Sequence, residues 1–147
     1  MDTASHGDHK SQFTAFLDTQ HRGEYDQQIR EMAKAADGRT SQRLLVSVND
    51  VRQFDPKLAT QLLRQPLRFL APWTEVVTER VQHATGKKNT SESISLAART
   101  HLGFVGTFGS HHVSPRELRA SQLGTMVCVE GVITRCSITR PKVVRSV

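Results

Sequence analysis

The last twenty residues of the chain, CVEGVITRCSITRPKVVRSV, hold the side chains best suited to binding phosphate groups. The only acid in this run, Glu130, precedes all four of its cations, which are Arg135, Arg140, Lys142 and Arg145. Guanidinium and ammonium groups along an extended strand can follow a nucleic-acid backbone. The same charges can instead keep an exposed strand edge from pairing with other chains. The residue types alone leave these two hypotheses open.

The run TGKKN at 85–89 contains the glycine and lysine of a phosphate-binding loop, but the rest of that motif is missing. A P-loop needs glycine where this chain has Val81, and serine or threonine where it has Lys88. Nothing in the chain resembles the G-x-S-x-G turn that presents a serine nucleophile. The sequence therefore predicts no nucleotide-binding loop and no catalytic residues.

Histidines and cysteines are the residues that could bind a metal ion. His111 and His112 are adjacent, so their rings cannot easily converge on one ion, and the cysteines lack a zinc-ribbon spacing. On one strand, Cys128 and Cys136 would lie about 26 Å apart at about 3.3 Å per residue, whereas a disulfide needs Cα atoms within about 7 Å. We therefore expect reduced, packed thiols and neither metal nor cofactor in this chain.

The positive charge is concentrated in the second part of the chain. Residues 1–84 hold eleven Lys and Arg against eleven Asp and Glu, whereas residues 85–147 hold nine against three. This excess favours a polyanionic partner, nucleic acid above all, although it can also serve solubility. The sequence shows no apolar run of about 18 residues and no secretory signal. We therefore expect a cytosolic or nuclear protein without membrane contact.

Hydrophobic periodicity predicts that helices make up most of the chain. A polar, disordered N-terminus over residues 1–10 is followed by two amphipathic helices from Ser11 onward, separated near Gly23. Residues 43–48, RLLVSV, fit either a strand or a buried connector. The spacing of Leu70, Trp73, Val77 and Val81 predicts another helix.

Prolines mark the expected helix boundaries. Asp55 and Pro56 predict a helix start, with a carboxylate cap and proline in the first turn, and Pro66 marks the end of that helix. The next helix is expected to begin at about Pro72. Beyond it, residues 96–102 are a short helical candidate.

The pattern changes towards the C-terminus. Ser114 and Glu117 predict the capping pair of a last short helix. From Thr125 the apolar residues recur at every second position, which predicts a strand. Gly131 stands where such a strand could bulge, as strands do at the corner of a small barrel.

Two runs resemble a known family. The first, at 49–66, reads NDVRQFDPKLATQLLRQP and resembles a signature of the N-terminal helical subdomain of the minichromosome maintenance (MCM) replicative helicases. The second begins at His112 with HVSPRELRASQLGTMVCVEG and resembles that family's passage into its OB-fold. Its segments HVSPR, VCVEG and RCSITRPKVVRSV are similar to one subunit of the eukaryotic six-subunit complex in particular.

The resemblance covers about residues 10–147 and implies a mainly α fold, in which an N-terminal helical bundle is followed by the first strand or strands of an incomplete OB-fold β-barrel. Residues 11–122 would form the helical subdomain, with a loop at about 85–95, and residues 123–147 would start the barrel. The roughly 23 residues from Thr125 onward are too few for a five-stranded barrel, so we expect a fragment of a longer parent.

The resemblance also implies a function. Members of this family form hetero-hexameric rings around single- and double-stranded DNA, are placed on replication origins in the nucleus by loading factors, and unwind DNA with ATP. Sites for ATP, magnesium and zinc would lie in the parent beyond this fragment, which should be inactive alone. Arg135, Arg140 and Lys142 match basic positions of the first barrel strand and following turn, and are candidates for DNA contact together with Arg145. The alternative is a protein-interaction module whose basic strand meets a neighbouring subunit and not DNA.

Overall fold

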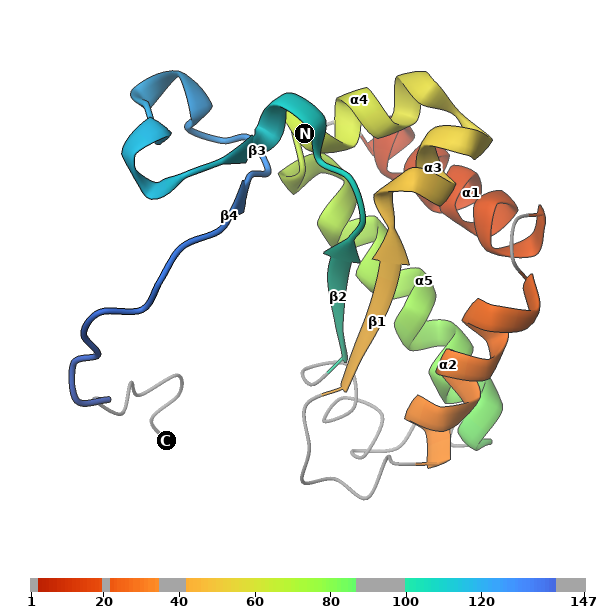
Figure 1. The fold of residues 1–147 in the computed structure, drawn as a ribbon. Helices are drawn as coiled ribbons and strands as arrows, with labels where there is room; N and C mark the ends of the chain where they lie inside the picture. The colour runs from red at the N-terminus through yellow and green to blue at the C-terminus, as the bar shows by residue number, and fades with distance from the viewer. Residues whose placement is uncertain (1–2, 20–21, 35–41, 87–99, 140–147) are drawn as a thin grey trace.

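Figure 1 shows the fold of the chain in a computed structural model. The structure describes residues 3–19, 22–34, 42–86 and 100–139. Its helices are α1 (Thr3–Thr19), α2 (Arg22–Lys34), α3 (Val48–Phe54), α4 (Pro56–Arg64) and α5 (Leu67–Thr85). Its strands are β1 (Gln42–Ser47), β2 (Thr100–Val105), β3 (His112–Val113) and β4 (Cys128–Val129). Short 3-10 turns occur at Gly109–His111, Pro115–Glu117 and Ala120–Gln122.

Helix α5 organises the core, because it packs against α1, α2 and β2. Trp73 of α5 is fully buried and stacks on Phe13 of α1, with ring centroids 4.3 Å apart and ring planes 10° from parallel. Phe69 meets the same indole edge-on, at a centroid distance of 5.8 Å. Aromatic rings bury more apolar surface than other side chains, so this cluster gives the largest local contribution to folding. The mainly α fold predicted from the sequence is confirmed.

Strand β1 settles the interpretation of residues 43–48 that the sequence left open. Leu44 and Val46 are fully buried while Leu45 between them is 45% exposed, which is the alternation of a strand with one covered face. Strand β1 pairs in parallel with β2, from Gln42 opposite Thr100 to Ser47 opposite Val105. Residues 43–47 therefore form a strand and not a connector, and Val48 begins α3.

The helix expected at 96–102 is wrong for residues 100–102, which belong to β2. Residues 96–99 lie outside the described residues. Pairing with β1 decides the conformation, and Gly103 permits the close packing there. A Cβ atom at Gly103 would lie 2.6 Å from Arg43 Cδ and 2.8 Å from Leu45 Cδ2. A contact of this kind joins distant parts of the chain, so the local residue pattern does not show it.

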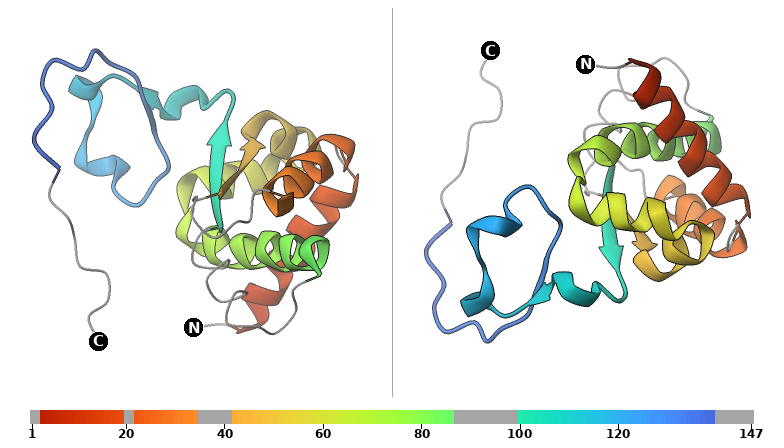
Figure 2. Two further views of the ribbon diagram at one scale, coloured as in Figure 1. Left: turned by 90° about the horizontal axis from the view of Figure 1, so that it is seen from below. Right: turned by 90° about the horizontal axis from the view of Figure 1, so that it is seen from above.

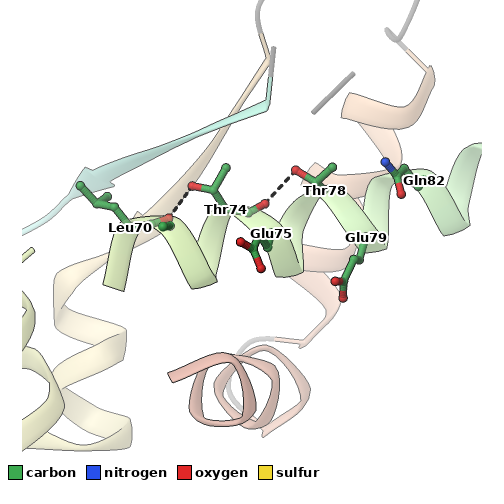
Figure 3. Close-up of a pocket in the computed structure, with 7 residues that line it drawn as sticks. Leu70, Thr74, Glu75, Thr78, Glu79 and Gln82 are labelled. Carbon is green, nitrogen blue, oxygen red and sulfur yellow. Dashed lines mark hydrogen bonds between the residues drawn. The ribbon is translucent and has the colours of Figure 1, made fainter. Parts of the chain in front are cut away.

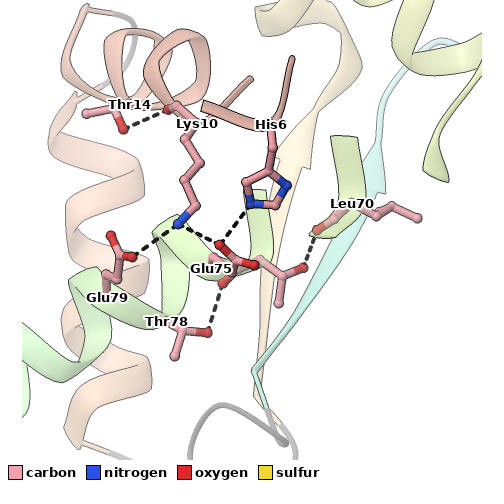
Figure 4. Close-up of polar contacts among 8 residues, drawn as sticks. His6, Lys10, Thr14, Leu70, Glu75, Thr78 and Glu79 are labelled. Atoms are coloured by element: carbon pink, nitrogen blue, oxygen red, sulfur yellow. Dashed lines mark hydrogen bonds and ion pairs between the residues drawn. The ribbon is translucent and has the colours of Figure 1, made fainter. Parts of the chain in front are cut away.

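Helix α1 begins at Thr3, whereas we expected residues 1–10 to be disordered and a helix to start at Ser11. The reason is a set of tertiary ion pairs with α5, shown in Figure 4. Lys10 Nζ binds the Glu75 carboxylate and lies 3.4 Å from Glu79 Oε1, and His6 Nε2 lies 3.1 Å from Glu75 Oε2. A polar segment can thus be helical when its charges have partners on a neighbouring helix.

Two helix boundaries depart from the predicted positions, and one is confirmed. Asp55 Oδ1 accepts a hydrogen bond of 2.8 Å from Lys57 N at the start of α4, as the sequence predicts. Helix α5, however, begins at Leu67, so Pro72 lies inside it instead of at its start. Pro72 is in the second turn of α5, where it removes one backbone hydrogen bond, and its buried ring adds to the core. Gly23 lies in the first turn of α2 and does not separate the helices.

We expect the size of the Trp73 side chain, and not its indole N–H, to stabilise the core. Trp73 Nε1 is buried and has no hydrogen-bond partner among the described residues. Trp73→Ala should lower the free energy of unfolding by about 3–5 kcal/mol, because it opens a large cavity. Trp73→Phe should cost only about 1–2 kcal/mol, because it keeps a ring and removes the unpaired donor. Urea denaturation of both variants measures this, and equal losses would contradict it.

Candidate functional site

Of the four predicted DNA-binding residues, Arg135 lies within the part of the chain that the structure describes. Arg135 lies in the extended segment after β4, and its side chain is exposed. No residue in the described part of the chain pairs with its guanidinium group. Arg140, Lys142 and Arg145 lie outside the described residues, and the DNA-binding role of all four residues stays a prediction. Figure 2 shows that the segment carrying Arg135 runs away from the helical body.

The start of this segment is fixed to the helical body by backbone hydrogen bonds. Met126 N donates to the carbonyl oxygen of Leu63 in the last turn of α4, at 2.8 Å. Met126 O lies 3.0 Å from His111 Nδ1, which donates if the proton is on that nitrogen. Strands β3 and β4 then pair in parallel, with His112 opposite Cys128 and Val113 opposite Val129. The point at which the basic segment leaves the helical body is therefore fixed by the bond to α4 and by the pairing of β4 with β3.

A small apolar cluster reinforces the same junction. Val48, Leu63 and Phe108 form its buried centre, and Met126 and Cys128 pack against it. These residues come from α3, α4 and two short segments of the C-terminal half, one at Phe108 and one at 126–128. Sequence periodicity misses a cluster of this kind, because each segment contributes only one or two residues.

Charged and capping groups complete the junction on the outside. Glu117 Oε2 accepts a hydrogen bond of 2.9 Å from Ser114 N, as the predicted capping pair requires. This backbone bond, followed by the contact with the Ser114 side chain, lowers the pKa of Glu117. His112 Nε2 lies 3.2 Å from Glu130 Oε2, so the two side chains attract each other when the imidazole is protonated. The capping pair orders the turn at 114–117, and the contact between His112 and Glu130 links β3 to the residue that follows β4.

The strand predicted from Thr125 is much shorter than expected, because only Cys128 and Val129 pair with another strand. Residues 130–139 have no regular secondary structure. Their apolar side chains are exposed, to 89% at Val132, 82% at Ile133 and 91% at Ile138. Alternating apolar residues form a stable strand only when a neighbouring strand pairs with them, and none does so within the described residues.

A shallow pocket of about 610 Å³ lies elsewhere, along one face of α5. Its lining side chains are shown in Figure 3. The hydroxyl groups of Thr74 and Thr78 donate to carbonyl oxygens one turn earlier in the same helix, at 2.6 and 2.8 Å. Glu75 and Glu79 are engaged by Lys10 of α1. These polar groups serve the helix and its packing, so the pocket holds no catalytic arrangement.

The described residues contain no group of three or more His, Cys, Asp or Glu side chains placed to hold a metal ion. Cys128 and Cys136 are free thiols, as expected, but the expected packing is wrong for Cys136, which is exposed because the segment after β4 has no neighbouring strand in the described part of the chain. None of the helices in the described ranges has the length and apolar character needed to cross a membrane.

The class of this protein follows from comparison of the whole fold. The N-terminal domain of an archaeal MCM, known from a crystal structure, superposes with a TM-score of 0.64 and covers 86% of this chain and 46% of the archaeal one. At 16% identity this likeness shows the fold alone. The sequence profile of the family described as the MCM N-terminal domain matches residues 10–106. The chain belongs to the MCM family.

Curated relatives define the similarity more narrowly. The DNA replication licensing factor MCM3 of Oryza sativa subsp. indica is 39% identical over 140 residues, which are 95% of this chain. The maternal DNA replication licensing factor mcm3 of Xenopus laevis is 40% identical over 139 residues, or 92% of this chain. The resemblance of HVSPR and VCVEG to one eukaryotic subunit, the third, is thus confirmed. The chain spans 17% of the length of the rice protein and 16% of the frog protein.

We expect Phe108 to hold the junction without contributing to the main core. Phe108→Ala should raise amide-exchange rates at residues 126–129 at least about tenfold, because it removes the centre of the small apolar cluster. The urea midpoint of the helical body should stay the same. Leu123→Ala, at an 82% exposed position, is the matched control and should change neither quantity. If the amide-exchange protection of residues 126–129 and the urea midpoint of the helical body both fell, the junction would not be separate from the main core.

The contacts of α1 with α5 should depend on pH. The hydrogen bond from Lys10, followed by that from His6, lowers the pKa of Glu75 below 4.5. A lowered acid pKa stabilises the fold above 4.5, and this contribution is lost as the pH falls through the folded-state pKa. Glu75→Gln should therefore cost about 0.2–1 kcal/mol at pH 7, and this cost should shrink as the pH falls below 4.5, as measured by thermal unfolding at pH 7 and at pH 3. Asp8→Asn is the control. A Glu75→Gln cost that is the same at both pH values would contradict the pairing.

Proposed function

We propose that this chain forms part of the N-terminal tier of a ring of MCM subunits and contacts the DNA backbone through its basic C-terminal run. The contact residues would be Arg135, Arg140 and Lys142, with Arg145 as a further candidate. The observation that carries the proposal is the exposed, unpaired Arg135 on an extended segment that leaves a fixed junction. Extended cationic segments bind phosphate backbones largely without regard to sequence.

The junction supports this proposal, because it limits where the basic run can go. Hydrogen bonding of Met126 to Leu63 and pairing of β3 with β4 set the exit point of residues 130–139. A cationic segment with one end fixed loses less conformational freedom on binding than a free tail does. Its phosphate contacts can then add affinity at a defined place on the protein.

The wider activity belongs to the same proposal. The relatives are named DNA replication licensing factors, so we infer a nuclear role in origin licensing, in initiation and in fork unwinding. Its partners would be the other subunits of a hetero-hexamer, single- and double-stranded DNA, and origin-loading factors. ATP, magnesium and zinc would be bound by parts of the longer relatives that this chain does not match. Helicase activity would therefore reside in the assembled ring.

A second function is favoured by the exposed apolar side chains of the same run. Val132, Ile133 and Ile138 have no partners in the described part of the chain, and a strand of a neighbouring subunit could cover them. In that case the arginines would flank a protein interface and would not meet DNA. Salt dependence separates the two functions, because only phosphate contacts release condensed counterions from the nucleic acid.

Replacing Arg135, Arg140 and Lys142 together by Ala, in the full-length subunit, should weaken binding of single-stranded DNA by the assembled ring. Each lost phosphate contact should reduce the log–log salt slope by about 0.7, so the triple variant should lose about 2. Fluorescence anisotropy at several salt concentrations measures both quantities.

The matched control replaces Arg30, Lys34 and Arg43, which lie on α2 and β1, and removes the same charge. Unchanged affinity and slope in the first variant would refute the DNA contact. If that variant instead fails to enter the ring while DNA binding by assembled rings is normal, the interaction module is the correct function.

A further inference from the structure

We propose that the corner between α4 and α5 is a docking surface for an acidic protein segment that carries an apolar side chain. This corner surface consists of Arg64, Leu67 and Arg68. It is separate from the basic C-terminal run, and its function does not depend on DNA contact there. The proposal rests on the pairing state of the cations, on one exposed leucine and on the rigidity of the corner.

The corner surface lies in a stretch of the chain without acids. Residues 56–74 contain no Asp or Glu, but they contain Lys57, Arg64 and Arg68. The flanking acids are already engaged, since Asp55 caps α4 and Glu75 binds Lys10 and His6. The overall charge does not show this cationic stretch, because residues 1–84 as a whole are neutral.

Other cations of the helical body serve the fold and have partners. Arg80 binds Asp18 at 2.7 Å and lies 3.7 Å from Asp26, which ties α5 to α1 and α2. Arg52 donates to Asn49 Oδ1 and to the carbonyl oxygen of Thr107. Arg64 and Arg68 are exposed and have no such partner among the described residues. Their charges contribute no pairing to the fold and are available to a ligand.

Leu67 indicates which kind of anion fits. It is 78% exposed, although it stands directly beside Arg68 at the first position of α5. A phosphate backbone gains nothing from an exposed leucine, and no exposed aromatic side chain occurs at the corner on which a base could stack. A protein segment can contact both the arginines and the leucine, because its carboxylates bind the arginines while an apolar side chain covers Leu67.

The corner is also rigid, which favours binding. Leu63, Pro66 and Phe69 are buried between the exposed residues. Gln65 N donates to Gln61 O at 2.8 Å, and Arg68 N donates to Gln65 O at 3.2 Å, so the backbone of the turn is held internally. A surface that is already ordered loses little conformational entropy when a partner binds.

The test uses the full-length protein and a fluorescein-labelled peptide of Asp, Glu and Leu residues, with a second peptide in which Ala replaces each Leu. Arg64→Glu with Arg68→Glu should weaken binding of the Leu peptide at least about tenfold, because attraction becomes repulsion. Arg30→Glu with Lys34→Glu changes the net charge equally on α2 and should leave binding unchanged. Leu67→Ala should weaken the Leu peptide about tenfold and the Ala peptide hardly at all.

Three results would overturn the proposal. The first is no binding of either peptide, and the second is an equal loss in the α2 control, which would show a general charge effect. The third is a loss of single-stranded DNA binding in the Arg64→Glu, Arg68→Glu variant as large as the loss of peptide binding, which would assign the corner to phosphates. Circular dichroism and the urea midpoint of each variant verify that the fold is retained. Failure here leaves the contact of Arg135 with DNA unaffected, because the two surfaces are altered by different variants.

Discussion

Burial of the apolar faces of α5 is the constraint on which the rest of the structure depends. This helix buries residues against α1, α2 and β2, so its side chains are covered from several directions. The stack of Trp73 on Phe13 lies at the meeting point of α5 and α1. Because Phe13 is held there, α1 must lie along α5, which places Lys10 opposite Glu75 and Glu79. The aromatic packing therefore makes the ion pairs possible. The ion pairs in turn hold the N-terminal turns of α1 against α5.

A second, polar contact determines how α2 meets the sheet. The Tyr25 hydroxyl donates to Asp50 Oδ2 at 2.8 Å and accepts from Ser47 N at 3.1 Å. The side chain of Ser47 in turn accepts from Asp50 N and caps α3. Burial raises the pKa of Tyr25 well above its ordinary value of 10.0, so the hydroxyl keeps its proton and its donor role. One buried side chain thus links α2, the end of β1 and the start of α3.

The sequence predicted those features that depend on neighbouring residues. The Asp55 cap and the pairing of Ser114 with Glu117 each involve residues a few positions apart. The errors arose where a distant segment decides the conformation. Residues 100–102 are a strand because β1 lies beside them, about sixty positions earlier in the chain. The bond from Met126 to Leu63, which places the candidate site, has no local pattern at all.

Ion pairing explains why the charge count along the sequence identified the cations of the C-terminal run and not those at the corner between α4 and α5. A neutral segment can carry a cationic patch when its acids are used in ion pairs elsewhere, as Glu75 and Asp18 are. Arg64 and Arg68, which have no partner among the described residues, follow Leu63 in the chain, and Leu63 also accepts the hydrogen bond from Met126 ahead of the basic run. The contacts that fold the helical body therefore also set the position of its free cations.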